Sequence, residues 1–124
     1  MERRVRIVAG PITAEAVLYG TPTAEGVFKA LPIEGRANRW GDEIYFSTPL
    51  DMPLEPEARE VVEPGELGFW PPGKALCIFF GPTPASRGDE VRAASPVNVF
   101  GRLLGDPKAF KRVKDGEKVR VEKV

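Results

Sequence analysis

The sequence predicts a mainly β protein, a closed barrel of about eight strands with two short helices. Short apolar or alternating segments recur along the chain, turn residues separate most of them, and helix signals occur at two places. The 13 glycines and 13 prolines among 124 residues supply the turns that many short strands require. At this length we expect a single domain over residues 1–124, and barrel closure would leave no open strand edge.

The first third of the chain predicts two strands followed by a helix. Residues 5–8 and 14–20 are short apolar segments, and Gly20 ends the second. Thr21 stands before a proline, which is typical of a helix N-cap followed by the first helical position. We therefore expect a helix over residues 22–31, ended by Pro32.

Residues 35–40 and 43–48 predict a β-hairpin with a two-residue loop at Gly41–Asp42, because glycine there can adopt positive φ. This loop fixes the register of the two strands, and strand periodicity then separates their faces. The expected cross-strand pairs on one face are Trp40–Glu43, Asn38–Tyr45 and Arg36–Ser47, and the other face carries Ala37, Ile44 and Phe46.

The second half combines two long loops with further strands. Residues 49–59 carry three prolines and predict an extended surface loop, and residues 81–96 predict a second loop. Between them, residues 75–80 are apolar on both faces, which predicts a central strand buried on two sides. The remaining expected elements are a Pro64–Gly65 turn between short strands, a strand from residue 97, a short helix after Asp106–Pro107, a turn at Asp115–Gly116 and a last strand over residues 118–124.

Composition excludes several classes of function. Lys plus Arg and Asp plus Glu number 18 each, so no net charge attracts nucleic acid, and we expect neither nucleic-acid nor membrane binding. Histidine is absent and Cys77 is the single cysteine, which removes an intrachain disulfide, a histidine-based zinc site and Ser–His or Cys–His nucleophile pairs. We expect no cofactor, no metal and a cytoplasmic location. Absence of Gln and scarcity of Asn favour a thermophilic source.

Several motifs resemble the cyclophilins. Residues 97–112, VNVFGRLLGDPKAFKR, are similar to their late strand and short helix. The segments ANRWGDEIYFST, WPPGKALCIFFGPTP and SPVNVFG more closely resemble a family of short cyclophilin-like proteins from bacteria and archaea, mostly uncharacterised. This resemblance covers nearly the whole chain and implies a cyclophilin-like β-barrel. It implies no particular activity, because that family's function is not established.

The chain departs from true cyclophilins at their catalytic motif. Where those proteins carry Phe-His-Arg, this sequence reads Asn38-Arg39-Trp40, and their Gln-Gly-Gly run is missing. Arg36 and Arg39 are approximate candidates for the catalytic arginine. Prolyl isomerisation needs an apolar pocket and a donor to the imide. We therefore expect isomerase activity to be absent or very weak.

Two surfaces are candidates for binding. The polar hairpin face combines charged, amide and aromatic groups, a mixture that binding surfaces favour, in Arg36, Asn38, Trp40, Glu43 and Tyr45. Trp70 and Lys74 flank the Pro71-Pro72-Gly73 corner and form the second candidate. The alternative for both is structural: the rings cover barrel wall and the charges are solvated.

The sequence thus predicts a binding module for a peptide or a small molecule. A weak peptidyl-prolyl isomerase and a non-catalytic protein-interaction scaffold remain as alternatives. Cys77, placed mid-strand among apolar residues, predicts an inert core thiol. Neither the ligand nor the oligomeric state follows from these residues.

Overall fold

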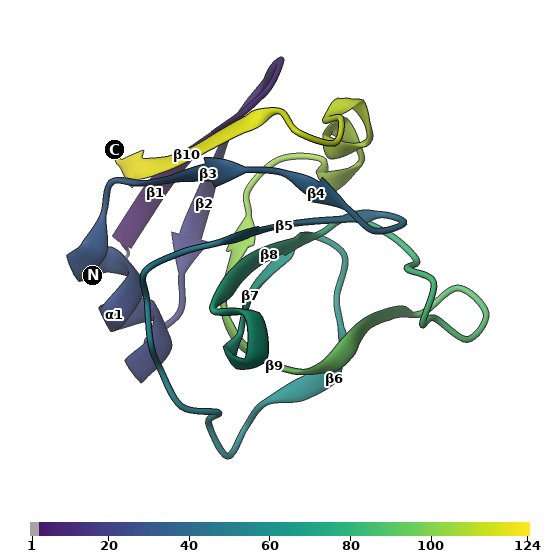
Figure 1. The fold of residues 1–124 in the computed structure, drawn as a ribbon, viewed down its shortest axis with the longest axis horizontal. Coiled ribbons are helices and arrows are strands. Elements are labelled where there is room, and N and C mark those ends of the chain that lie inside the picture. Colours follow the sequence, from purple (N-terminus) through teal and green to yellow (C-terminus); the bar gives the residue numbers. More distant parts are fainter. Residues whose placement is uncertain (1–2) are drawn as a thin grey trace.

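The computed structural model describes residues 3–124 and is mainly β (Figure 1). The strands are β1 (Arg3–Ala9), β2 (Ile12–Leu18), β3 (Ile33–Arg36), β4 (Asn38–Arg39), β5 (Glu43–Ser47), β6 (Arg59–Val62), β7 (Glu66–Trp70), β8 (Ala75–Phe79), β9 (Val91–Leu103) and β10 (Lys118–Lys123). The helices are α1 (Pro22–Ala30) and two short 3₁₀ segments, η1 (Pro71–Gly73) and η2 (Pro107–Arg112). Within the described range, no helix is long and apolar enough to cross a membrane.

The strands pair antiparallel in the order β3-β10-β1-β2-β9-β7-β8-β5-β4, and β6 pairs with β9 beside this path. The mainly β class is confirmed, whereas the expected closed barrel is not, because the hydrogen-bonded ladder has two ends. These ends are β3 and β4, which are consecutive in the chain and separated by Ala37 alone. The ring of Phe46 lies against Gly35, where an added Cβ would come within 2.7 Å of it. A side chain thus fills the space between β3 and β5.

This switch of partner corrects one expected pair of the hairpin. Arg36 lies opposite Lys118 of β10 instead of Ser47 of β5. The change occurs at Ala37, whose N–H donates to the Glu117 carbonyl at 2.8 Å and whose carbonyl accepts from Gly116 at 2.7 Å. The chain therefore pairs with β10 as far as Arg36 and begins to pair with β5 at Asn38.

The central strand β8 is buried along its whole length, as its sequence predicts. Leu76 and Ile78 belong to the main core, which fills the interior between the strands. Ala75, Cys77 and Phe79 point the other way and belong to a second apolar cluster with residues of β6 and β9. A strand with apolar side chains on both faces is thus explained by two separate cores.

Helix α1 begins and ends close to the predicted positions. The Thr21 hydroxyl accepts a hydrogen bond from the Ala24 N–H at 3.1 Å, so Thr21 is the N-cap. Ala24 and Val27 are buried against the main core. The second predicted helix is the 3₁₀ segment η2, with the Asp106 carboxylate accepting from the Lys108 N–H at 3.0 Å.

The proline-rich segment 49–58 is a loop between β5 and β6, as expected, and the buried amide of Asn98 holds it to the rest of the fold. Asn98 of β9 is 1% exposed. Its Nδ2 donates to the Thr23 hydroxyl at 3.0 Å and to the Pro53 carbonyl at 2.9 Å, and its Oδ1 accepts from the Glu55 N–H at 2.8 Å. Glu55 in turn accepts from Thr23. One side chain thus joins β9, α1 and this segment.

Candidate functional site

The β4–β5 hairpin has the predicted loop and register around it. Asn38 lies opposite Tyr45, and the Trp40 N–H donates to the Glu43 carbonyl at 2.9 Å. Gly41 has a φ of 60°, the left-handed conformation that favours glycine. A Cβ there would also come within 2.9 Å of the Thr83 backbone. Sequence reasoning therefore placed Trp40, Glu43 and Tyr45 correctly on one face.

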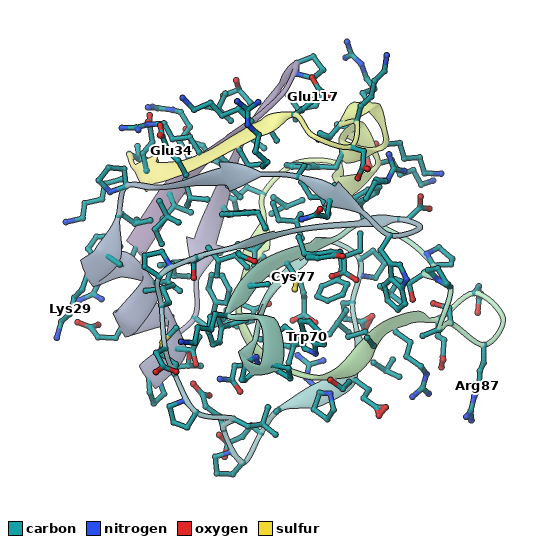
Figure 2. All side chains as sticks on the ribbon, in the orientation of Figure 1. Lys29, Glu34, Trp70, Cys77, Arg87 and Glu117 are labelled. Carbon is teal, nitrogen blue, oxygen red and sulfur yellow. The ribbon has the colours of Figure 1, made fainter. Side chains whose placement is uncertain are left out.

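That face forms one wall of a pocket of about 240 Å³. The lining residues are Trp40, Glu43, Tyr45, Trp70, Cys77, Ala93, Ala94 and Val97. Figure 2 shows Trp70 and Cys77 close to the middle of the molecule, whereas the other labelled side chains lie toward its periphery. The pocket opens over the second apolar cluster and not into the main core.

A bulge in β9 creates the opposite wall. Val61 of β6 pairs with Arg92 and Arg59 with Val97, so the four residues 93–96 of β9 stand opposite the single residue Glu60 of β6. Extra residues in one strand bend it away from its partner and redirect its side chains. Ala93 and Ala94 lie in this bulge, and their small side chains leave space facing the aromatic rings.

Sequence reasoning missed the bulge because it assigned residues 81–96 to a loop. The signal was present: Val91, Ala93 and Val97 keep the alternation of a strand. Pro96 argued against a strand because proline cannot donate to a ladder. The bulge removes that objection, since residues 93–96 are not in regular register with β6.

Trp70 is held in place at the pocket by a hydrogen bond. Its indole N–H donates to the hydroxyl of Ser95, in the β9 bulge, at 2.6 Å. The side chain is half-buried and packs on the second cluster. The indole N–H is therefore occupied by the protein, and Trp70 offers a ligand its apolar ring.

Glu43 is the charged residue of the pocket, and its burial differs from expectation. A side chain on a binding face is expected to be accessible, but Glu43 is 5% exposed. Burial raises the pKa of Glu43 to about 7, and a hydrogen bond from Cys77 partly opposes that effect. No ion pair involves Glu43 among residues 3–124. A carboxyl group that can gain or lose a proton near neutral pH thus lines an apolar pocket.

Cys77 is buried, as expected of a core thiol, but it also lines the pocket. Two acceptors are within reach of its thiol: the Ala75 carbonyl, with the sulfur 4.0 Å from the oxygen, and the Glu43 carboxylate. The carboxylate is the stronger acceptor when ionised. Burial, together with the neighbouring Glu43, raises the pKa of Cys77 well above its ordinary value. A protonated thiol is a poor nucleophile.

Three predicted binding residues lie away from the pocket. Asn38 is exposed and donates to the Tyr45 carbonyl at 3.2 Å. Arg36 donates to the Gly116 carbonyl at 3.3 Å, at the β3 edge. Lys74 is an exposed residue with a φ of 48° that lies 3.9 Å from the Asp51 carboxylate. The structure thus brings together Trp40, Glu43, Tyr45 and Trp70, and leaves these three outside.

Arg39 has a structural role. Its guanidinium donates to the carbonyls of Lys111, Val113 and Gly41 and forms an ion pair with Asp42 at 3.2 Å. It also stacks over the Phe80 ring, 5.0 Å from the centroid. With these partners the guanidinium fastens the hairpin to the segment after η2.

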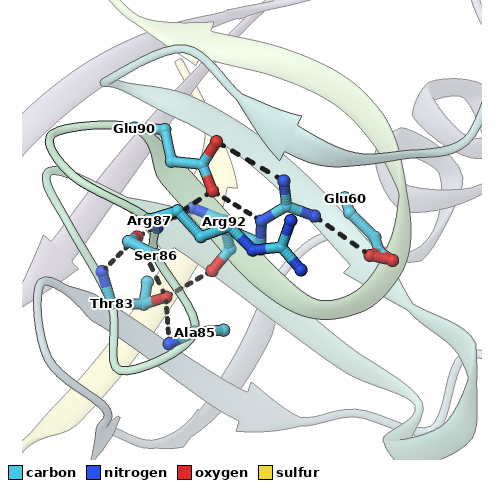
Figure 3. A network of polar contacts seen from close by, with 7 residues as sticks. All are labelled: Glu60, Thr83, Ala85, Ser86, Arg87, Glu90 and Arg92. Carbon is cyan, nitrogen blue, oxygen red and sulfur yellow. Dashed lines mark hydrogen bonds and ion pairs between the residues drawn. The ribbon is translucent and has the colours of Figure 1, made fainter.

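The loop over residues 81–90 supports the tip of the same hairpin. The Asp42 N–H donates to the Pro82 carbonyl at 2.9 Å. Figure 3 shows how the loop is ordered: Thr83 and Ser86 bond to each other and to Arg92, and Arg92 forms ion pairs with Glu90 at 2.6 Å and Glu60 at 3.3 Å. Because Arg92 directly precedes the β9 bulge, this network connects the tip of the hairpin to the opposite wall of the pocket.

Residues 3–122 match the family described as cyclophilin-like. The chain belongs to the cyclophilin-like family. Among the described residues of this cyclophilin-like chain, no group of three or more His, Cys, Asp or Glu side chains is arranged to hold a metal ion.

The cyclophilin-like chain is similar to the solution structure of the hypothetical protein AF2241 from Archaeoglobus fulgidus. The identity is 44%, the TM-score is 0.83, and the match covers 99% of this chain and 95% of that one. It is also similar in fold to McbB, solved in complex with tryptophan, with a TM-score of 0.70 and 16% identity over 96% of this chain and 44% of that one. No curated protein matches the chain.

Proposed function

We propose that this chain is a binding module whose pocket between the β4–β5 hairpin and the β9 bulge receives a small molecule or a side chain of a peptide. The observation that carries this proposal is the pocket itself, lined by three aromatic residues and one carboxyl group. Ligand sites are typically concave and mostly apolar, with a few polar groups that fix orientation. The pocket has this composition.

The volume indicates the size of the ligand. Pockets for drug-sized molecules measure roughly 300–1,000 Å³, and about 240 Å³ is slightly smaller. A ligand of side-chain size fits such a space. McbB, a fold relative, binds tryptophan, so free amino acids are reasonable members of a ligand screen for this chain.

Prolyl isomerisation is less well supported. Arg39 uses its guanidinium to fasten the hairpin, and Arg36 lies at the edge of β3 beside Gly116. Neither lines the pocket, and the Trp70 indole N–H is already bonded to Ser95. We therefore expect no acceleration of a proline-containing reporter peptide, measured as its cis–trans relaxation rate with and without the protein.

Intrinsic fluorescence offers a direct test of binding, because Trp40 and Trp70 are the two tryptophans of the chain and both line the pocket. A library of amines, amino acids, organic acids and short proline-containing peptides is titrated against the protein. We expect at least one class to change the emission in a saturable manner.

The blocking variant is Ala94→Leu. Ala94 is exposed at the pocket, so a larger side chain there reduces the space without disturbing a core. Ala109→Leu is the matched control, because Ala109 is also exposed but lies on η2 outside this pocket. We expect Ala94→Leu to abolish the fluorescence response and Ala109→Leu to retain it. A response that survives in Ala94→Leu would mean that the ligand binds elsewhere.

A further inference from the structure

Among residues 3–124, those that line the pocket include one acidic side chain and no basic one. Glu43 is the carboxyl group among its lining residues, and Tyr45 and Cys77 are the other titratable groups there. The neighbouring Asp42 is engaged with Arg39. An anionic ligand would therefore face a carboxylate without any compensating cation, and a cationic ligand would face its natural partner.

Glu43 is largely buried and forms no ion pair within the described chain. A buried carboxylate without a counter-charge is unfavourable, and pairing it with a cation recovers part of the desolvation penalty. In the free pocket the ionised Glu43 carboxylate has no positively charged partner, and a positively charged ligand would supply one.

The remaining walls are suited to the same kind of ligand. Trp40, Tyr45 and Trp70 contribute aromatic rings, and the indole N–H of Trp70 is occupied by Ser95. Aromatic faces attract alkylammonium groups through their quadrupole, and rings with an acidic residue are a known way of binding quaternary ammonium. Ala93, Ala94 and Val97 provide apolar contacts for methyl or methylene groups.

From this combination we propose that the pocket binds an organic cation, an alkylammonium head with apolar substituents, through the Glu43 carboxylate and the rings of Trp40, Tyr45 and Trp70. This inference rests on the proposed binding function and specifies its ligand class. The same head group occurs in free amines and in methylated lysine side chains of peptides, and the experiment distinguishes these two sources.

The affinity for such a ligand should depend on pH. Cation binding requires ionised Glu43, and burial raises the pKa of that carboxyl to about 7 in the free protein. Cys77 from β8 and Tyr45 from β5 face it, and neither carries a positive charge that would change the sign. For a ligand of permanent charge, simple proton competition makes binding about tenfold weaker at pH 6 than at pH 8.

The experiment compares choline with 3,3-dimethylbutan-1-ol, a neutral molecule of the same shape, by tryptophan fluorescence and calorimetry. A peptide containing trimethyl-lysine and the same peptide containing norleucine form the second pair. We expect the cation of at least one pair to bind at least tenfold more tightly than its neutral analogue. Which pair responds identifies the free amine or the peptide as the source.

Glu43→Gln is the decisive variant, because it retains shape and removes the charge. We expect it to equalise the cation and the neutral analogue and to remove the dependence on pH. Lys74→Ala is the control, since Lys74 lies outside the pocket. Equal binding of charged and neutral probes by the unmodified protein, or binding of organic acids alone, would overturn the cation proposal and leave the binding function standing. If no probe and no member of the wider library bound, both the cation proposal and the proposed binding function would be overturned.

Discussion

The properties of Glu43 depend on residues far away in sequence, because its neighbours in the pocket come from β7, β8 and β9. It enters β5 directly after the hairpin loop, which fixes the direction of its side chain. Glu43 is 5% exposed, and Tyr45 on the same face packs against the second cluster, which contains residues of β6, β8 and β9. The two-residue loop at Gly41–Asp42 could therefore predict which residues share a face with Glu43. It could not predict that the Glu43 side chain is buried.

The raised pKa of Glu43 has a consequence for stability. Burial raises the pKa in the folded chain to about 7 from an ordinary value of 4.5, so between these pH values the folded chain holds a proton that the unfolded chain has lost. Stability therefore falls as pH rises through this window. Glu43→Gln should match the unmodified protein near pH 4.5 and exceed it at pH 8, by up to about 3 kcal/mol.

Chemical denaturation at a series of pH values measures this difference. Glu57→Gln serves as the matched control because Glu57 is exposed in the proline-rich segment; its curve should run parallel to that of the unmodified protein. If Glu43→Gln were equally or less stable at pH 8, the carboxyl would not be held in an unfavourable environment.

At the scale of elements, β8 contributes to both cores, and Phe79 is its largest side chain on the side of the second cluster. Phe79 is fully buried. Phe79→Ala should lower the free energy of unfolding by about 3–5 kcal/mol, because it removes apolar contact and leaves a cavity. Denaturant titration gives the value, and a loss below about 1 kcal/mol would show that the second cluster is loosely packed.

Asn98 offers a second test at this scale, since it holds the proline-rich segment to β9 and α1. Asn98→Ala leaves the Glu55 N–H and the Pro53 carbonyl without the partner that they have now. Each buried polar group left unpaired costs about 1–3 kcal/mol. We expect a clear loss of stability and faster proteolysis within residues 49–58.

The matched control is Asn38→Ala, because Asn38 is the other asparagine of the chain and is exposed with one hydrogen bond. It should change stability by well under 1 kcal/mol. Similar losses for the two variants, or an unchanged proteolysis pattern for Asn98→Ala, would show that Asn98 does not fasten the segment.

Elements with local signals were predicted from sequence, and those that depend on distant partners were not. Thr21–Pro22 and the two-residue loop define α1 and the hairpin through neighbouring residues. The start of β9 was missed because Pro96 is compatible with a strand only inside a bulge opposite β6. The open ladder was missed because β3 pairs with β10, which is distant in sequence, before the chain pairs with β5 from Asn38, and no local pattern shows this change of partner.

At the scale of the whole molecule, the main core and the proposed binding pocket lie on opposite faces of the central strand β8. The main core includes Ala24 and Val27 of α1, whereas the second cluster includes Val62 of β6 and Val91, Ala93 and Val97 of β9. Figure 1 shows α1 at the lower left and β6 with the first half of β9 at the lower right. The pocket opens over the second cluster. This arrangement lets pocket residues vary with a smaller effect on the main core, so variants at Ala94 are expected to change binding more than folding.

Two-dimensional NMR of the tryptophan side chains and the backbone amides tests most directly whether this pocket is the binding site. The protein is titrated with choline and, separately, with the trimethyl-lysine peptide, and at least one of them should give the result below. The predicted result is saturable shifts of both indole N–H signals and of the amides of Tyr45, Ala93 and Ala94, with little change at Arg36, Lys74 or η2. The shifts should disappear in Glu43→Gln. Shifts centred on Arg36 and Lys74, or indole signals that stay unchanged at saturating concentrations of both cations, would contradict binding of an organic cation in this pocket.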